Sequence, residues 1–151
     1  MKENQNLFRD LQEDFRKMKK NLLVAQSGGP TAAINATLAG VIKQAIKEEQ
    51  IDQVYGACYG IQGVLEQKFV NLTEKVDTEE KLEKLKRTPA AALGSCRFKL
   101  NDIKEDDSQY QEIVDILHKM NIGYFVYIGG NDSMDTVAKL SAYCKEKGVE
   151  D

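Results

Sequence analysis

The chain has little of the chemistry that several common kinds of site require. Its 151 residues include one histidine, His118, so a multi-histidine metal site is excluded. The three cysteines, Cys58, Cys96 and Cys144, form no CxxC pair, and an odd number of them argues against a disulfide framework. We therefore expect free, buried thiols.

Long apolar runs and an excess of basic charge are also absent. The longest apolar stretches, such as residues 22–25 and 125–128, are too short for a membrane span or a signal peptide. The net charge is -3, and the lysines are interleaved with acidic residues, so the chain lacks the basic surface typical of nucleic-acid binding. We expect a soluble cytoplasmic protein that binds neither membrane nor nucleic acid.

What the chain does contain is an alternation of short apolar segments and amphipathic segments. Residues 1–20 carry apolar side chains at helical spacing and form an expected amphipathic leader, and residues 21–151 form the main domain. In that domain we predict strands at 22–26, 51–59, 68–72, 88–97 and 124–128, and helices at about 30–48, 78–86, 107–120 and 133–147. Strands that alternate with helices predict a mostly parallel sheet between two helical layers, a three-layer αβα, Rossmann-like fold.

Several local features refine this prediction. Residues 59–63 contain two glycines and are expected to form a loop, and residues 68–72 are expected at an edge of the sheet. Asp107 is expected to cap the helix that follows it, and Gly123 is expected to end that helix. The helix at 30–48 should turn one apolar face inward, made of Ile34, Leu38, Val41, Ile42, Ala45 and Ile46.

Two of the predicted strands end in similar glycine turns that lead into helices. The first turn is Ser27-Gly-Gly-Pro30, and the second is Gly129-Gly-Asn-Asp-Ser133. Glycine allows close approach to an anion, and the following helix offers unpaired N–H groups and the positive end of its dipole. Ligands of parallel sheets bind at the carboxyl ends of the strands, so the turns predict one shared phosphate site. Taken separately, each turn also fits a tight connection or a helix cap.

The polar side chains near these turns add further expectations. A carboxylate among donors that face a phosphate repels the ligand unless a divalent cation intervenes, and Mg²⁺ has the required oxygen preference. Arg97 follows a Gly-Ser turn and either neutralises a transferring phosphoryl group or forms a surface salt bridge. The glycine turns lack a Walker lysine and the G-x-G-x-x-G pattern, which disfavours a nicotinamide dehydrogenase.

Three motifs in order, at residues 27–35, 94–98 and 128–133, resemble those of the phosphofructokinase family. The resemblance runs from about residue 21 to the end of the chain. It implies a phosphofructokinase N-terminal domain and phosphoryl transfer to the 1-hydroxyl of fructose 6-phosphate, a glycolytic reaction that uses Mg²⁺. It also implies an enzyme of two similar α/β domains that forms homo-oligomers.

The resemblance further implies roles for single residues. Arg97 would stabilise the transition state, and Asn131 replaces an aspartate that binds Mg²⁺ in most members. A neutral amide oxygen is a poorer Mg²⁺ ligand than a carboxylate, which weakens the case for direct metal coordination by Asn131. The positions that match the family's donor-phosphate site are Gly28, Gly29, Arg97, Phe98, Gly130, Asn131, Asp132 and Ser133.

Asp132 carries the expectation about the phosphoryl donor. ATP-using members of the family have glycine at this position, and pyrophosphate-using members have aspartate. A carboxylate adds bulk and negative charge where the α-phosphate of a nucleotide would lie, and pyrophosphate needs no such room. We therefore favour pyrophosphate as the donor. The alternatives are an ATP-dependent 6-phosphofructokinase and a non-catalytic α/β module that binds a phosphate-bearing ligand.

The family's general base is an aspartate in a Thr-x-Asp-x-Asp motif after the last helix predicted here. The sequence contains no such motif up to Asp151, and the residues that bind the sugar would also follow this point. We therefore expect the chain to be the donor-binding part of a larger enzyme and to be inactive by itself.

Overall fold

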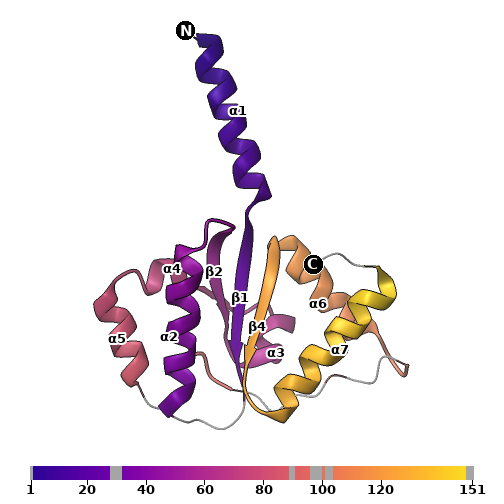
Figure 1. Cartoon of the computed structure of the whole chain (residues 1–151). Coiled ribbons are helices and arrows are strands. Elements are labelled where there is room, and N and C mark those ends of the chain that lie inside the picture. Colours follow the sequence, from indigo (N-terminus) through magenta and orange to yellow (C-terminus); the bar gives the residue numbers. More distant parts are fainter. Residues whose placement is uncertain (1, 28–31, 89–90, 96–99, 101–103, 149–151) are drawn as a thin grey trace.

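A mixed β-sheet forms the centre of the molecule (Figure 1). The structure, a computed structural model, describes residues 2–27, 32–88, 91–95, 100 and 104–148, with the backbone alone at residues 15–18, 32, 131 and 132. Within these ranges the sheet has the order β3-β2-β1-β4, with the bounds β1 Lys20–Gln26, β2 Ile51–Ala57, β3 Phe69–Asn71 and β4 Ile122–Ile128. β1 pairs in parallel with β2 and with β4, whereas β3 pairs antiparallel with β2 at the edge. The mostly parallel sheet and the edge strand are thus confirmed.

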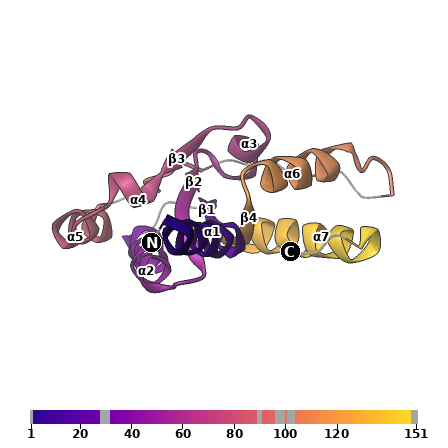
Figure 2. The same cartoon turned by 90° about the horizontal axis from the view of Figure 1, so that it is seen from above.

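Helices cover both faces of this sheet, which confirms the three-layer prediction. In Figure 2, α2 lies on one side of the sheet and α3 and α6 lie on the other. The described helices are α1 Lys2–Met18, α2 Ala32–Lys47, α3 Gly60–Leu65, α4 Leu72–Lys75, α5 Glu79–Arg87, α6 Ser108–Lys119 and α7 Asn131–Lys147. None of them is long and apolar enough to span a membrane.

β1 lies inside the sheet between β2 and β4, and its side chains reach two separate cores. Leu23 and Ala25 pack with buried residues of α3 and α6, whereas Leu22 and Val24 pack with buried residues of α2. A strand buried on both faces is typical of a parallel sheet with helices above and below it, and it explains the unbroken apolar run in the sequence.

The helix predicted within residues 1–20 is present as α1, and it projects from the amino end of β1 away from the sheet (Figure 1). Leu7, Phe8 and Leu11 on this helix are 57–63% exposed. The apolar face recognised in the sequence is therefore solvent-exposed at these three residues. The division into a leader and a main domain at residue 20 stays a prediction.

The segment predicted as a loop at residues 59–63 is instead the start of α3, and that prediction was wrong. Tyr59 precedes the helix in a left-handed conformation, with φ 65°, and Ile61 and Val64 are fully buried in the core. Apolar residues three positions apart lie on one face of a helix, so the buried pair favours a helix over a loop.

The strand predicted at residues 88–97 is also wrong over its described part, because residues 91–95 form a turn. Leu93 is buried against the core beside α2, but its N–H donates to the Gln26 side chain and its C=O accepts from the Tyr59 N–H, so neither group pairs with the backbone of a strand. An apolar run alone does not distinguish a strand from a buried turn whose backbone is satisfied by side chains.

Three smaller predictions also differ from the structure. Gly123 lies inside β4, and α6 is followed instead by Asn121 in the left-handed region, with φ 55°. Asp107 precedes α6 without a capping hydrogen bond from its side chain. Ile46 is 49% exposed, because it lies at the border of the apolar face of α2. Cys58 and Cys144 form no disulfide and are only half-buried, and Cys96 lies outside the described residues.

Gln67 offers a stability test of the turn between α3 and β3. Its φ is 56°, a region that costs a non-glycine residue about 1 kcal/mol, and the residue is exposed. We expect Gln67→Gly to raise the free energy of unfolding by about 0.5–1 kcal/mol, or Tm by about 2 °C. Thermal unfolding followed by circular dichroism measures this, and Gln67→Ala should show no gain. Equal Tm values for the two variants would contradict the explanation.

Candidate phosphate-binding site

The two glycine turns begin side by side, at the carboxyl edge of the sheet. Gln26 and Ile128, the last residues of β1 and β4, are aligned partners, and the N–H of Ser27 donates to the Ile128 carbonyl oxygen at 2.7 Å. A Cβ placed on Gly129 would lie 2.5 Å from the Ser27 carbonyl oxygen. This contact requires glycine, because a real Cβ does not approach an oxygen so closely.

The second turn exposes the start of α7. Gly130 precedes the helix in an extended conformation, no side chain caps it, and the first bond of the helix runs from the Met134 N–H to the Gly130 carbonyl oxygen at 3.1 Å. The N–H groups of residues 131–133 therefore have no partner within the helix, and they lie at the positive end of its dipole. A Cβ on Gly130 would meet nothing within 4 Å, so the space beside this residue is open.

Ser133 supplies an unpaired donor at the same place. Its side chain is 2% exposed, and its Oγ has no hydrogen-bond partner in the described structure. The Oγ lies against Gly129, and thus at the junction of the two turns. A buried hydroxyl without a partner costs free energy, so such a group needs an explanation. An anion held at the start of α7 provides one, because the hydroxyl can donate to it.

The other predicted site residues have less structural support. Gly28, Gly29, Arg97 and Phe98 lie outside the described residues. Asn131 and Asp132 occupy the first two positions of α7, but their side chains are not described. The structure therefore places Gly130 and Ser133 together beside the carboxyl end of β1. The roles of all eight residues stay predictions.

Two buried amide side chains were missed by the sequence analysis. Gln26 ends β1 and Asn35 lies in the first turn of α2, and neither side chain is exposed to solvent. Their amides are joined by a hydrogen bond of 3.1 Å from Gln26 Nε2 to Asn35 Oδ1. A polar residue that ends an apolar strand, followed by an amide on the apolar face of the next helix, was the available signal.

The described residues suit an anion better than a metal ion. They contain no group of three histidine, cysteine or acidic side chains placed to hold a metal. Backbone N–H groups and a hydroxyl donate to phosphate oxygens, whereas Mg²⁺ needs oxygen ligands. These donors therefore do not form a protein cage for Mg²⁺.

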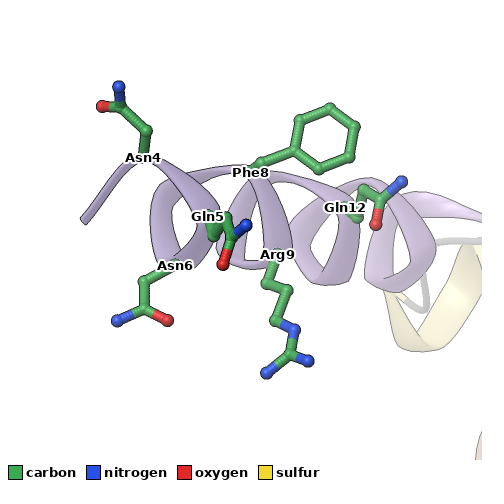
Figure 3. Close-up of a pocket in the computed structure, with 6 residues that line it drawn as sticks. All are labelled: Asn4, Gln5, Asn6, Phe8, Arg9 and Gln12. Carbon is green, nitrogen blue, oxygen red and sulfur yellow. The ribbon is translucent and has the colours of Figure 1, made fainter. Parts of the chain in front are cut away.

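Two hollows lined by described residues both lie away from the glycine turns. One, of about 700 Å³, lies on α1, where Asn4, Phe8 and Arg9 point in different directions (Figure 3). The other, of about 430 Å³, is an apolar groove along β4 that includes Val126 and Leu140. A hollow on a single projecting helix and an apolar groove both lack the converging donors that a phosphate needs.

The charged pairs with shifted pKa values also lie away from the turns. The hydrogen bond from Lys68 lowers the pKa of the Glu66 carboxyl, and the hydrogen bond from Lys81 lowers the pKa of Asp77. Both pairs are on the exposed surface, where ion pairs contribute little to stability.

Comparison with known proteins agrees with this geometry. Residues 21–149 match the family described as Phosphofructokinase. The chain is 44% identical over 123 residues to a pyrophosphate--fructose 6-phosphate 1-phosphotransferase of Rhodospirillum rubrum. The matched region is 82% of this chain and 29% of that relative. It is 40% identical over 129 residues to the protein of the same name from Halomonas elongata, and this match includes 85% of this chain and 30% of that relative.

A solved structure shows the same likeness. The crystal structure of a pyrophosphate-dependent phosphofructokinase from Nitrosospira multiformis matches with a TM-score of 0.77 and 37% identity, over 85% of this chain and 31% of that protein. The chain thus spans less than a third of the length of each of these three proteins. Because the family match covers nearly all of the sequence after α1, including both glycine turns, the chain belongs to the phosphofructokinase family.

Proposed function

We propose that this chain supplies the pyrophosphate-binding part of a pyrophosphate-dependent 6-phosphofructokinase. The observation that carries the proposal is the unpaired, buried Ser133 hydroxyl at the open start of α7, beside the end of β1. The names of the similar proteins support the same donor and the same sugar phosphate. The longer enzyme would be a cytoplasmic homo-oligomer that converts fructose 6-phosphate to fructose 1,6-bisphosphate.

In this proposal the residues of this chain bind and orient the donor. The N–H groups at the start of α7 and the Ser133 hydroxyl hold the oxygens of pyrophosphate, and Arg97 stabilises charge as the phosphoryl group moves. The 1-hydroxyl oxygen of the sugar attacks the terminal phosphorus and gives its proton to the general base of the longer enzyme, the bridging P–O bond breaks, and inorganic phosphate leaves. Mg²⁺, bound to the donor, would neutralise part of the charge on pyrophosphate.

The proposed donor preference is tested by exchanging one carboxylate. A negative charge 4 Å from a phosphate costs about 1 kcal/mol in water and more where water is excluded, so we expect Asp132→Gly to strengthen ATP binding about fivefold to tenfold. Isothermal titration of the chain with Mg-pyrophosphate and Mg-ATP measures both affinities. The parent chain should bind pyrophosphate and not ATP.

Asp135→Gly is the matched control for this experiment. Asp135 lies one turn further along α7, where its carboxylate pairs with Lys139 at 2.9 Å. The control removes the same charge and adds the same glycine, but away from the turn, so it should leave both affinities unchanged. A gain in ATP binding by both variants would show a general charge effect and would contradict the assigned role of Asp132.

A further experiment tests the absence of the acceptor half. We expect the chain alone, incubated with pyrophosphate, Mg²⁺ and fructose 6-phosphate, to form no fructose 1,6-bisphosphate above the uncatalysed rate. The general base belongs to a motif that this sequence does not contain. Product formed at enzymatic rates would contradict the proposed division of the site.

A further inference from the structure

The buried amides of Gln26 and Asn35 connect three parts of the carboxyl edge. Gln26 lies directly before the first glycine turn, and Asn35 lies in the helix that follows this turn. Thr88 and residues 91–94, the third part, precede and begin the motif at 94–98. The two amides therefore link the first family motif, to which Asn35 belongs, with residues at the start of the second.

The two amides bond to the backbone of Thr88, Ala92 and Leu93. The Leu93 N–H donates to Gln26 Oε1 at 2.8 Å, and the Ala92 N–H donates to Asn35 Oδ1 at 2.9 Å. Asn35 Nδ2 donates to the Thr88 carbonyl oxygen at 2.6 Å. The side-chain amides thus supply the bonds that a neighbouring strand would otherwise supply, which is why this segment keeps its place without joining the sheet.

Such an arrangement fixes position as well as contributing stability. Both side chains are fully buried, and the amide oxygens and nitrogens of both have partners. A buried polar network that is fully satisfied in one geometry disfavours other geometries, because any shift leaves a buried donor or acceptor unpaired. Thr88, Ala92 and Leu93 are therefore held in one place relative to Gln26, the residue before Ser27.

Tyr59 holds the same segment from the other side. Its N–H donates to the Leu93 carbonyl oxygen at 2.8 Å, and its ring covers Gly94, where a Cβ would lie 2.7 Å from a ring carbon. Tyr59 adopts φ 65° and Gly94 adopts φ 76°. A tyrosine in the left-handed region is uncommon, and such residues persist where the surroundings enforce them, often at binding sites.

We propose that Gln26, Asn35 and Tyr59 are positioning residues of the phosphate site. They hold Thr88 and residues 91–94 beside Ser27, where the first glycine turn begins, and so fix the position of Gly94, the first residue of the motif that contains Arg97, without touching the ligand themselves. This inference rests on the proposed function, because it assumes that the motif at 94–98 contributes to pyrophosphate binding. It goes beyond that function because it names the side chains that hold the start of this motif in position relative to Ser27.

Two variants test the proposal by pyrophosphate titration of the whole chain. Gln26→Met keeps the length of the side chain but leaves the Leu93 N–H unpaired, and we expect the Kd for Mg-pyrophosphate to rise about tenfold. Tyr59→Asn removes the exposed ring at a backbone conformation that asparagine tolerates, so the fold is retained. For this variant we expect a rise of about threefold, since the backbone bond to Leu93 remains.

Tyr143→Phe is the control for a purely structural effect. It removes a hydrogen bond of 2.6 Å from the Tyr143 hydroxyl to Gln111, near the far end of α7. All titrations are run below the onset of melting, and hydrogen exchange of the Ala92 and Leu93 amides reports the local position. Exchange of the Ala92 and Leu93 amides should be faster in Gln26→Met than in the parent and unchanged in Tyr143→Phe. The control should bind pyrophosphate like the parent.

The outcomes separate the inference from the function it rests on. If the parent binds pyrophosphate and both Gln26→Met and Tyr59→Asn bind it within about twofold of the parent, the positioning role is overturned while the proposed function stands. If the parent itself does not bind pyrophosphate, the proposed function is contradicted, and the inference falls with it. Weaker binding by both variants with an unchanged control supports the proposal.

Discussion

Gly129→Ala is expected to weaken pyrophosphate binding more than about tenfold and to destabilise the fold. The added Cβ would collide with Ser133 Oγ and would lie 2.5 Å from the Ser27 carbonyl oxygen. The carbonyl directly follows the central strand β1, so it does not move aside as a flexible side chain does. Overpacking of this kind costs about 1–3 kcal/mol, which predicts a fall in Tm of about 2–12 °C.

The loss of binding has a separate physical reason. If the start of α7 moves away from the end of β1, the helix N–H groups and the Ser133 hydroxyl no longer converge on one place. We therefore expect the affinity for Mg-pyrophosphate to fall more than about tenfold at a temperature where the variant is still folded. Calorimetric titration combined with thermal unfolding measures both effects on one sample.

Gly130→Ala separates an effect on packing of the protein from an effect on access of pyrophosphate to the site. A Cβ on Gly130 meets no protein atom within 4 Å, and its φ of -94° suits any residue. We expect the Tm of this variant to match the parent, while its affinity for pyrophosphate falls, because the methyl group occupies the open space beside the α7 N–H groups. Full pyrophosphate affinity in Gly129→Ala would contradict the assignment of the site to this turn.

Gly63→Ala is expected to have the largest effect on stability. Gly63 lies in α3, and a Cβ there would collide with the Cys58 carbonyl oxygen and lie 2.7 Å from the Cys58 carbonyl carbon. The Lys68 N–H donates to the Gly63 carbonyl oxygen at 2.8 Å, and the Cys58 N–H donates to the Lys68 carbonyl oxygen at 2.9 Å. Moving any of these groups breaks the connection between β2 and β3.

We expect Gly63→Ala to lower the free energy of unfolding by about 3 kcal/mol or more, measured by urea denaturation. Gly40→Ala in α2 is the matched control, since a Cβ on Gly40 meets nothing within 4 Å. Replacing an exposed glycine inside a helix with alanine should instead raise stability by about 0.5–1 kcal/mol. Similar unfolding midpoints for the two variants would show that the close contact at Cys58 is not structurally important.

The parts of the fold that were predicted correctly are those with a strong local pattern. Residues 22–26 form a continuous apolar run, and the helix at about 30–48 repeats apolar residues at helical spacing, so both were placed within a few residues of β1 and α2. The adjacency of the two glycine turns followed from topology, because parallel strands present their carboxyl ends at one edge.

The errors arose where tertiary contacts decide the local structure. Residues 88–97 were predicted as a strand from their apolar character, but their described part is a turn held by Gln26 and Asn35, which are distant in sequence. Residues 59–63 were predicted as a loop from their glycines, although Gly63 is needed for a close contact inside a helix. Composition alone does not reveal which role a glycine has.

The candidate site shows the same contrast between what the sequence predicts and what only the structure reveals. The sequence predicted Ser133 as a phosphate-binding residue, but the unpaired, buried state of its hydroxyl is visible only in the structure. Conversely, Arg97 and the side chain of Asp132 were assigned through the family resemblance, and both lie outside the described atoms. Titration of Asp132→Gly beside its control Asp135→Gly tests the role of Asp132.

The most direct test of the central claim is a titration of the ¹⁵N-labelled parent chain with Mg-pyrophosphate, followed by amide NMR shifts. The account predicts saturable shifts concentrated at Ser27 and at the amides of residues 129–133, with no comparable shifts on α1 or along the groove beside β4. Absence of saturable shifts, or shifts centred on that groove, would contradict the claim that the ends of β1 and β4 form a pyrophosphate site.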